Sequence, residues 1–222
     1  MKIETMKGRQ ENSGYSRVFN DKELGFLLSK VQATVISNGN ELEKIILSQC
    51  NVIEELNFFI DRVAENNIED GIFVCEKKAI KNSRYAIGID PDLLIFIVGK
   101  KKVCKVIELK DGDSFDTKKS KGEKDNLQKF ATVFGAKIPF ITEYYICCFN
   151  QLDKEQIRQG FKNCFELENI MTGKELCEIL RIDYEKIIAD RNKDAQSNLE
   201  YFVENLLKIQ SVRELIEEKL SA

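Results

Sequence analysis

Histidine is absent from all 222 residues of this chain. Without an imidazole, the protein cannot form a Ser-His-Asp triad, a Cys-His pair, a HExxH zinc site or a histidine-based nuclease centre. Tryptophan is also absent, and only two prolines occur. Any hydrolysis that the protein performs must therefore depend on carboxylates, lysine and a metal ion.

Paired cysteines and long apolar runs are missing as well. None of the seven cysteines belongs to a CxxC pair, so we expect neither a disulfide framework nor a zinc site. No segment approaches the roughly 20 apolar residues that cross a bilayer, and the polar start of the chain does not resemble a signal peptide. We expect a cytoplasmic protein with no membrane partner and no organic cofactor.

The pattern of apolar residues indicates an alternation of helices and strands. Apolar residues make up 43% of the chain, enough to bury one sizeable core, so the sequence predicts a single domain over residues 1–222. The polar segment 1–14 is expected to be mobile. The order of elements predicts an α/β fold with a central mixed β-sheet flanked by helices. Strands are expected over residues 72–75, 85–89, 92–98, 103–110 and 138–149.

Helices account for the rest of the pattern. One is expected from about residue 21, with an interruption at Asn38-Gly39-Asn40, and another over 41–66. A Ser120-x-x-Glu123 capping box predicts a helix that ends at Gly135. The C-terminal part, 153–219, is expected to be helical over roughly 153–161, 172–181 and 185–219. The last helix carries apolar residues that indicate either core packing or a dimer seam, namely Leu199, Phe202, Val203, Leu206, Leu207, Leu215 and Ile216.

Segments 92–98 and 103–110 have the pattern of a β-hairpin. If residues 99–101 close a three-residue loop, position i pairs with position 200 − i, which places Asp92 opposite Glu108. Strand residues two apart share a face, so Glu108 and Lys110 point the same way. A slip of one residue would scatter the charges to opposite faces. In the expected register, two carboxylates and one ammonium converge at one end of an apolar hairpin.

This combination of charges is typical of a divalent-metal site. Magnesium prefers oxygen ligands and keeps several waters, so two carboxylates and a phosphate oxygen suffice to bind it. One alternative is an exposed strand pair with no ligand, and another is that Asp90, on the same face, replaces Asp92. A calcium loop starting at Asp111 is excluded, because its sixth and twelfth positions are Asp116 and Gly122.

Charge is unevenly distributed along a chain whose net charge is −3. Residues 77–137 hold 15 Lys and Arg against 8 Asp and Glu, whereas residues 1–76 and 138–222 each carry a net charge of −5. A basic surface around a metal-binding acid pair suits a polyanionic substrate. An ordinary solvated, lysine-rich surface is the alternative.

Pro91-Asp92, fifteen intervening residues and then Glu108-Leu109-Lys110 resemble the signature of the PD-(D/E)xK nuclease superfamily. The polar segment 111–123 is similar to the one that follows this signature in Type II restriction endonucleases. The resemblance covers about residues 84–150, and we expect the catalytic core at about 41–150. It implies a restriction-endonuclease-like fold and a site-specific, magnesium-dependent endonuclease acting on double-stranded DNA.

The resemblance also implies roles for individual residues. Asp92 and Glu108 would bind Mg²⁺, for which Mn²⁺ can substitute, together with the backbone carbonyl of Leu109, and Lys110 would assist the attacking water. Many superfamily members add an upstream helical glutamate, for which Glu54 and Glu55 are candidates if they do not simply form a solvated helix face. The lysines expected to contact DNA phosphates are Lys118, Lys119, Lys121 and Lys124.

Cleavage of both strands with one signature per chain implies a homodimer. Two alternatives remain at this point. One is a structure- or repair-directed nuclease of the same superfamily, and the other is a non-catalytic DNA-binding protein on the same scaffold.

Overall fold

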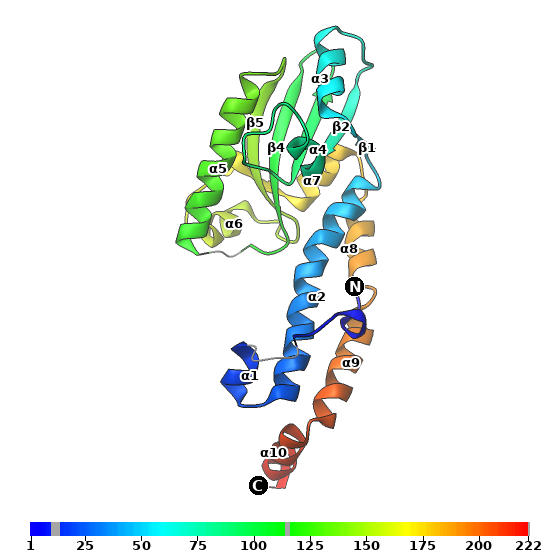
Figure 1. Ribbon diagram of the computed structural model, residues 1–222, viewed down its shortest axis with the longest axis vertical. Helices are drawn as coiled ribbons and strands as arrows, with labels where there is room; N and C mark the ends of the chain where they lie inside the picture. Colours follow the sequence, from blue (N-terminus) through cyan, green and yellow to red (C-terminus); the bar gives the residue numbers. More distant parts are fainter. Residues whose placement is uncertain (10–13, 114–115, 222) are drawn as a thin grey trace. The chain divides into compact units, whose positions relative to one another are not determined.

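A computed structural model describes residues 1–9, 14–113 and 116–221 (Figure 1). The chain divides into two compact units, one of residues 42–184 and one of residues 1–41 and 185–222. The first contains the β-sheet and the second is helical. Residues 10–13, part of the segment predicted to be mobile, lie outside the described residues. No helix of the described chain is long and apolar enough to cross a membrane.

A six-stranded mixed sheet forms the centre of the 42–184 unit. Its strands follow one another in chain order across the sheet, from β1 to β6. β1 is parallel to β2, β3 is antiparallel to both of its neighbours, and β4, β5 and β6 are parallel. This arrangement confirms the α/β prediction with a central mixed sheet. The strands are β1 (Asn51–Val52), β2 (Gly71–Glu76), β3 (Leu93–Val98), β4 (Val103–Lys110), β5 (Ile141–Cys148) and β6 (Ile170–Thr172).

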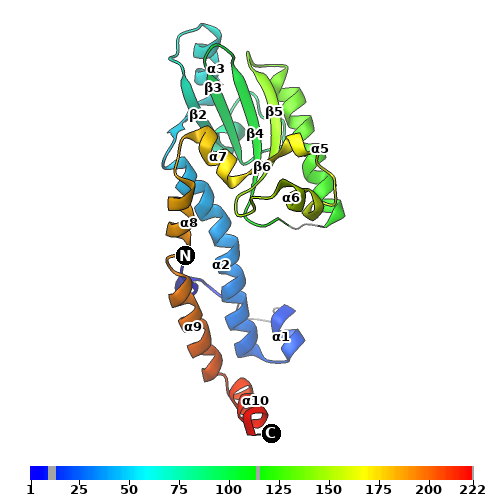
Figure 2. The ribbon, with the colours of Figure 1, turned by 180° about the vertical axis from the view of Figure 1, so that it is seen from behind.

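Helices cover both faces of this sheet. On one face lie α3 (Leu56–Ala64), the short α4 (Lys77–Lys81) and α5 (Thr117–Gly135), which packs on β4 and β5 (Figure 1). Seen from behind, α7 (Gly173–Leu180) crosses the opposite face beside β5 and β6 (Figure 2). α6 (Lys154–Gly160) contacts β6. The helices predicted at about 153–161 and 172–181 are therefore confirmed.

The main hydrophobic core lies between the sheet and helices α3 and α5. Phe96 of β3 is fully buried and contacts Phe59 of α3 and Phe134 of α5, with ring centroids 5.0 and 6.4 Å apart. Burying each such ring contributes about 1.5–3 kcal/mol. The predicted inner face of α5 is buried throughout, at Leu127, Phe130, Ala131 and Phe134. This packing sets α5 firmly against the strands that carry the acidic residues.

The β3–β4 hairpin has the predicted register. Every pair in its ladder sums to 200, as expected, and the even-numbered residues of both strands face the core under α5. The turn occupies residues 99–102, between the last residue of β3 and the first of β4. The pairs are Leu93 with Ile107, Leu94 with Val106, Ile95 with Lys105, Phe96 with Cys104 and Ile97 with Val103.

Several predicted boundaries are wrong. No strand forms at 85–89, where Gly88 has a φ of 76° and Tyr85 is buried against Phe134 in an irregular segment. α5 begins at Thr117, because the side chain of Asp116 caps it by accepting from the backbone N–H of Lys119. The predicted capping box at 120–123 therefore does not begin the helix. α4, β1 and β6 were not predicted.

The helices that lie wholly or mostly in the helical unit also differ from their prediction. α2 (Lys22–Leu47) passes through Asn38-Gly39-Asn40 without a break and ends well before residue 66. Its apolar face, which includes the buried Leu42 and Ile46, continues across the polar triplet, so packing outweighs the local turn tendency. The segment predicted as one helix at 185–219 forms three. They are α8 (Tyr184–Asn192), α9 (Ala195–Lys208) and α10 (Gln210–Ser221), and α1 (Gly14–Phe19) completes the unit.

The described start of the chain is held against this unit. Ile3, in a 3-10 turn over Ile3–Thr5, is only 7% exposed, and its backbone N–H donates to Asn198 at 2.8 Å. The terminal ammonium pairs with Asp194 at 3.0 Å. Residues 1–9 therefore contribute to the packing of α9.

Candidate active site

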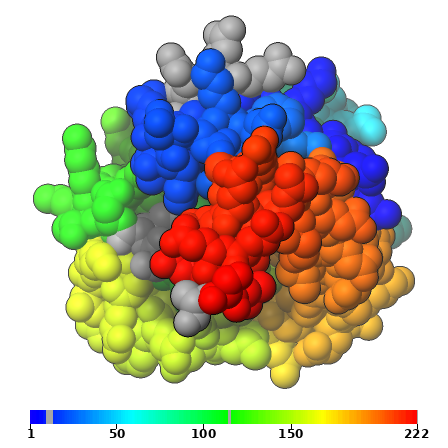
Figure 3. Space-filling view, turned by 90° about the horizontal axis from the view of Figure 1, so that it is seen from below, coloured from blue at the N-terminus to red at the C-terminus, as the bar shows by residue number. Residues whose placement is uncertain are grey.

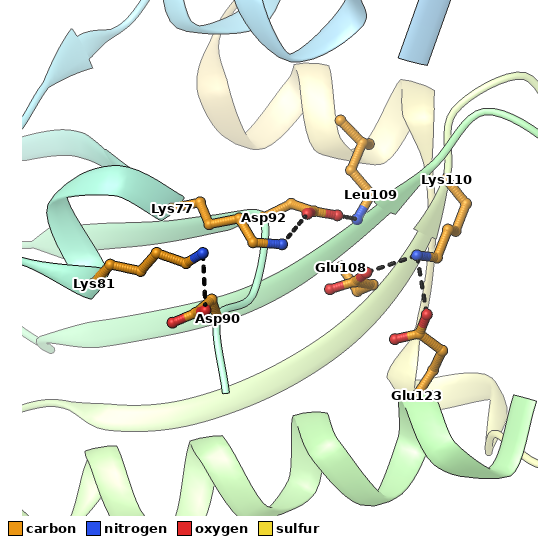
Figure 4. A network of polar contacts seen from close by, with 8 residues as sticks. All are labelled: Lys77, Lys81, Asp90, Asp92, Glu108, Leu109, Lys110 and Glu123. Carbon is orange, nitrogen blue, oxygen red and sulfur yellow. Dashed lines mark hydrogen bonds and ion pairs between the residues drawn. The ribbon is translucent and has the colours of Figure 1, made fainter. Parts of the chain in front are cut away.

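The end of the β3–β4 hairpin brings together the three residues of the sequence signature. Asp92 directly precedes β3, while Glu108 and Lys110 lie near the end of β4, on the face that α5 covers (Figure 4). All three side chains are largely buried, with exposed fractions of 11%, 14% and 19%. The predicted convergence of two carboxylates and one ammonium is therefore present.

The Asp92 carboxylate is anchored by the neighbouring strand. Its Oδ2 accepts a hydrogen bond from the backbone N–H of Leu109 at 2.9 Å. Its Oδ1 lies 3.4 Å from Nζ of Lys77, the first residue of α4. One oxygen thus holds the carboxylate in place through a rigid backbone, and the other faces a lysine whose side chain is 44% exposed.

The surroundings of Glu108 disfavour the ionised form of its carboxyl group. Burial, followed by the negative charge of Asp92, raises its pKa to about 7, although Lys110 opposes the rise. Lys110 donates to Glu108 Oε1 at 2.6 Å. Two acids this close favour an added cation, because a cation would relieve the repulsion that one lysine only partly offsets.

Lys110 lies between two carboxylates. Its Nζ is 2.6 Å from Glu108 and 3.2 Å from Oε1 of Glu123, which projects from α5 (Figure 4). Burial works to lower the pKa of Lys110, but the charges of Glu108, Glu123 and Asp92 outweigh it, and the pKa is raised. The ammonium is therefore kept charged beside the acid pair.

A further glutamate near this site was missed in the sequence. Glu43, near the end of α2, is half-buried, and burial followed by the charge of Asp92 raises its pKa. It also interacts with the charges of Lys77 and Lys110. The signal that was available is its position between Leu42 and Ile46, two residues of the helix face that the sequence predicts to be apolar.

The two upstream glutamates considered from the sequence lie elsewhere. Glu55 precedes α3 as its N-terminal cap residue, and Glu54 is its neighbour; both are exposed. They line a separate hollow with Glu76, Lys78 and other residues. Their predicted helix, 41–66, is interrupted here by β1 and its connections.

Asp90, the alternative to Asp92, pairs with a different lysine of α4. Its Oδ2 lies 3.3 Å from Nζ of Lys81. Asp90 and Glu108 both line a hollow of about 200 Å³, which also includes Lys77 and Glu123. The four lysines predicted to contact phosphate lie on the first two turns of α5, where Lys118, Lys119 and Lys121 are exposed and Lys124 is half-buried.

The site offers ligands that suit a hard divalent cation. Asp92 and Glu108 provide carboxylate oxygens, which are ligands of the kind that magnesium binds. Within the described residues, no group of three or more Asp, Glu, His or Cys side chains is arranged to hold a metal. Magnesium commonly binds proteins through one or two carboxylates and keeps several waters, so the acid pair alone is compatible with this ion.

Comparison with known proteins identifies the family. No family model and no solved structure matches the chain. A curated protein, the Type II restriction enzyme HhaII of Haemophilus parahaemolyticus, is 58% identical over 219 residues, which cover 96% of each chain. Identity at this level over almost the whole length shows that the chain belongs to the Type II restriction enzymes.

Proposed function

We propose that this Type II restriction enzyme hydrolyses phosphodiester bonds of double-stranded DNA at a short specific sequence and requires Mg²⁺ to do so. As a member of this family, the protein is a site-specific deoxyribonuclease. The observation that carries the assignment to particular residues is the meeting of Asp92, Glu108 and Lys110 at one end of the β3–β4 hairpin. We propose that the enzyme acts on DNA in the cytoplasm.

Asp92, Glu108 and the backbone carbonyl of Leu109 are the proposed ligands of the metal ion. A bound Mg²⁺ supplies Lewis-acid stabilisation of the phosphate and lowers the pKa of a coordinated water, and Mn²⁺ supplies similar chemistry. The hydrogen bond from Leu109 keeps Asp92 in one orientation. Glu43 is a further candidate for binding the ion through water, because its charge already interacts with Asp92.

Lys110 is proposed to act on the reacting phosphate directly. Its ammonium is held charged by the acids around it, and it can donate hydrogen bonds to the attacking water and to phosphate oxygens. A fixed cation at this position stabilises the negative charge that develops on the phosphate oxygens as water attacks the phosphorus atom. The exposed Lys118, Lys119 and Lys121, with Lys124, are proposed to contact DNA phosphates farther along the strand.

Digestion of a sequenced plasmid or phage DNA tests the function. With Mg²⁺ we expect a discrete ladder of fragments, and with excess chelator we expect uncut DNA. Cutting that follows junctions or damage in place of a sequence would support a structure-directed nuclease. DNA binding without cleavage in Mg²⁺ or Mn²⁺ would support a binding protein and would contradict the proposal.

A homodimer is the proposed active form, because one chain carries one catalytic set and a duplex has two strands to cut. The helical unit offers an apolar surface for a second copy. Ten of the fifteen exposed large apolar side chains among the described residues belong to this unit. In Figure 3 the surface of α10 (red) lies beside that of α9 (orange). The ten are Val18, Phe19, Val35, Ile36, Leu199, Val203, Leu207, Leu215, Ile216 and Leu220.

The exposure of three apolar residues on α9 bears on one of the two sequence interpretations of the C-terminal helix, core packing. Leu199, Val203 and Leu207 follow one another at helical spacing on α9 and are 58%, 42% and 46% exposed. Core packing is therefore wrong for these residues. A dimer seam remains a proposal, since contiguous exposed apolar surface of this kind marks interaction sites.

Sedimentation of three proteins tests the proposed surface. We expect the wild type to sediment as a dimer and the Leu199→Glu variant as a monomer, because a buried, unpaired carboxylate would oppose association. Leu152→Glu, at an equally exposed leucine of the other unit, should remain dimeric. A wild-type monomer both free and bound to DNA would contradict the dimer, and a dimeric Leu199→Glu variant would contradict the surface.

A further inference from the structure

Glu123 is an acidic residue of the site to which the proposed chemistry gives no role, and it contacts the proposed catalytic lysine. The sequence assigns it to a capping box, but α5 begins three residues before Ser120, so Glu123 lies inside the helix. Its carboxylate points to Lys110, with Oε1 3.2 Å from Nζ (Figure 4). It is therefore a second carboxylate on the catalytic ammonium, contributed by a different element from Glu108.

The geometry around Lys110 shows why a second carboxylate matters. Glu108 holds the ammonium at 2.6 Å through Oε1, yet Glu108 is also a proposed metal ligand. An oxygen that binds a metal ion has less charge to offer a lysine, so the Glu108 contact weakens when the site is loaded. Glu123 has no such competing role, and its contact can persist in both states.

α5 is well suited to hold this carboxylate in place. Ser120, one turn before Glu123, is fully buried and donates to the backbone carbonyl of Asp116 at 2.9 Å. Leu127, one turn after it, is 2% exposed. Glu123 is thus anchored on both sides by packed residues of a helix that contacts β4 and β5, and rigid elements hold catalytic groups more precisely than loops do.

We propose that Glu123 is a positioning residue. It holds the Lys110 ammonium in place when Glu108 binds the metal ion and its own contact with Lys110 weakens. It keeps one Lys110 donor engaged and leaves the others free for the attacking water and the phosphate. It also ties the catalytic lysine to α5, the helix that carries the lysines proposed to contact DNA. The inference rests on the proposed function and adds a residue to it.

The test compares Glu123→Ala with Asp125→Ala. Asp125 is an exposed acid of the same helix that lines a different hollow with Gln128, Lys129 and Thr132, so its variant removes an equal charge without touching Lys110. Each protein is assayed for single-turnover cleavage, for the Mg²⁺ concentration at half-maximal rate, and for DNA affinity in chelator.

We expect Glu123→Ala to lower the cleavage rate constant about 10- to 100-fold, the size typical of residues that orient a catalytic group. The half-maximal Mg²⁺ concentration should rise. Without Glu123, the Lys110 ammonium has only the Glu108 carboxylate to bind, so it competes with Mg²⁺ for that carboxylate. DNA affinity should stay within about twofold of wild type, and Asp125→Ala should match wild type throughout.

Three results would overturn the inference. They are wild-type cleavage and Mg²⁺ dependence in Glu123→Ala, a loss of DNA affinity as large as the loss of rate, and an equal loss of rate in Asp125→Ala. Lys110→Ala, measured in parallel, separates this failure from a failure of the proposed function. If the wild type cleaves and Lys110→Ala does not, the function stands whatever Glu123→Ala shows.

Discussion

The Glu108→Gln variant is expected to cleave DNA about a thousandfold more slowly than wild type. Glutamine keeps the size of the side chain and one oxygen near Lys110, but it removes the negative charge that a divalent cation requires. The loss of one fixed electrostatic contact to a transition state typically costs a hundred- to a thousandfold, and weaker metal binding adds to it. Lys110→Ala is expected to lose cleavage to a similar extent. The measurement is the single-turnover rate at saturating Mg²⁺.

Retained DNA binding separates this loss of chemistry from a loss of recognition. Removing a negative charge beside the scissile phosphate leaves the phosphate contacts of the α5 lysines unchanged, so affinity in chelator should equal or exceed that of wild type. Cleavage by Glu108→Gln or Lys110→Ala at a rate near wild type would show that the signature residues do not perform the reaction.

Two other glutamates provide a graded comparison. Glu43→Gln is expected to raise the Mg²⁺ concentration at half-maximal rate about tenfold or more, because Glu43 interacts with the charge of Asp92. Glu55→Gln should leave it unchanged, since Glu55 lies at the start of α3 in a separate hollow. A shift in Glu55→Gln without one in Glu43→Gln would restore the assignment first made from the sequence.

The central part of the site could be predicted because it is local. Asp92, Glu108 and Lys110 belong to a single hairpin, in which the turn and the two-residue period of the strands determine which side chains meet. Both runs are apolar on both faces, so a shifted register would bury the charges without partners. The register in the structure is accordingly the one that the pattern indicates.

Glu43 and Glu123 could not be predicted in the same way. Each comes from a helix outside the hairpin, Glu43 from one well before it and Glu123 from the helix that follows it, and only packing decides which face of a helix meets the hairpin. For Glu123, a local pattern was misleading. The capping-box spacing from Ser120 is real, but Asp116 caps the helix earlier, which leaves Glu123 free to face Lys110.

Irregular backbone and long helices limited the fold prediction. The segment 85–89 has the composition of a strand, yet Gly88 adopts a positive φ and the segment covers the core without joining the sheet. On α9, the apolar spacing correctly indicates a helix but does not identify what covers its apolar side. Hydrophobic periodicity reports that a face is apolar, and whether that face meets its own core or another molecule depends on tertiary structure.

The same Glu108→Gln substitution is expected to stabilise the metal-free protein above neutral pH. The carboxyl of Glu108 has a pKa of about 7 in the folded protein, raised mainly by burial and then by Asp92, against 4.5 for an ordinary glutamate. A group whose pKa is higher in the folded state stabilises the fold fully only below the unfolded value, and this contribution is lost as pH rises to about 7. At pH 8 the ionised carboxylate costs the wild type about 3 kcal/mol, which a neutral glutamine avoids.

Urea unfolding in chelator at pH 5 and pH 8 measures this effect. We expect Glu108→Gln to unfold at a higher urea concentration than wild type at pH 8, with a much smaller difference at pH 5. Comparing variant with wild type at each pH cancels the contributions of all other titrating groups. A saturating concentration of Mg²⁺ should reverse the order at pH 8, because only the wild type binds the ion tightly.

Glu143→Gln, on the other face of the sheet, is a control that should change the stability at pH 8 in the opposite direction. Burial raises the pKa of Glu143, but hydrogen bonds from Lys105 and Tyr145 and the charge of Lys105 outweigh it, so the pKa is lowered. This carboxylate stabilises the fold when ionised, and its removal should weaken the protein at pH 8. If Glu108→Gln were also less stable than wild type at pH 8 in chelator, the acid pair would not be strained before metal binding. An inactive but more stable Glu108→Gln variant would instead show that the fold tolerates two adjacent buried carboxylates at a cost in stability, which is the condition expected of a site built to receive a cation.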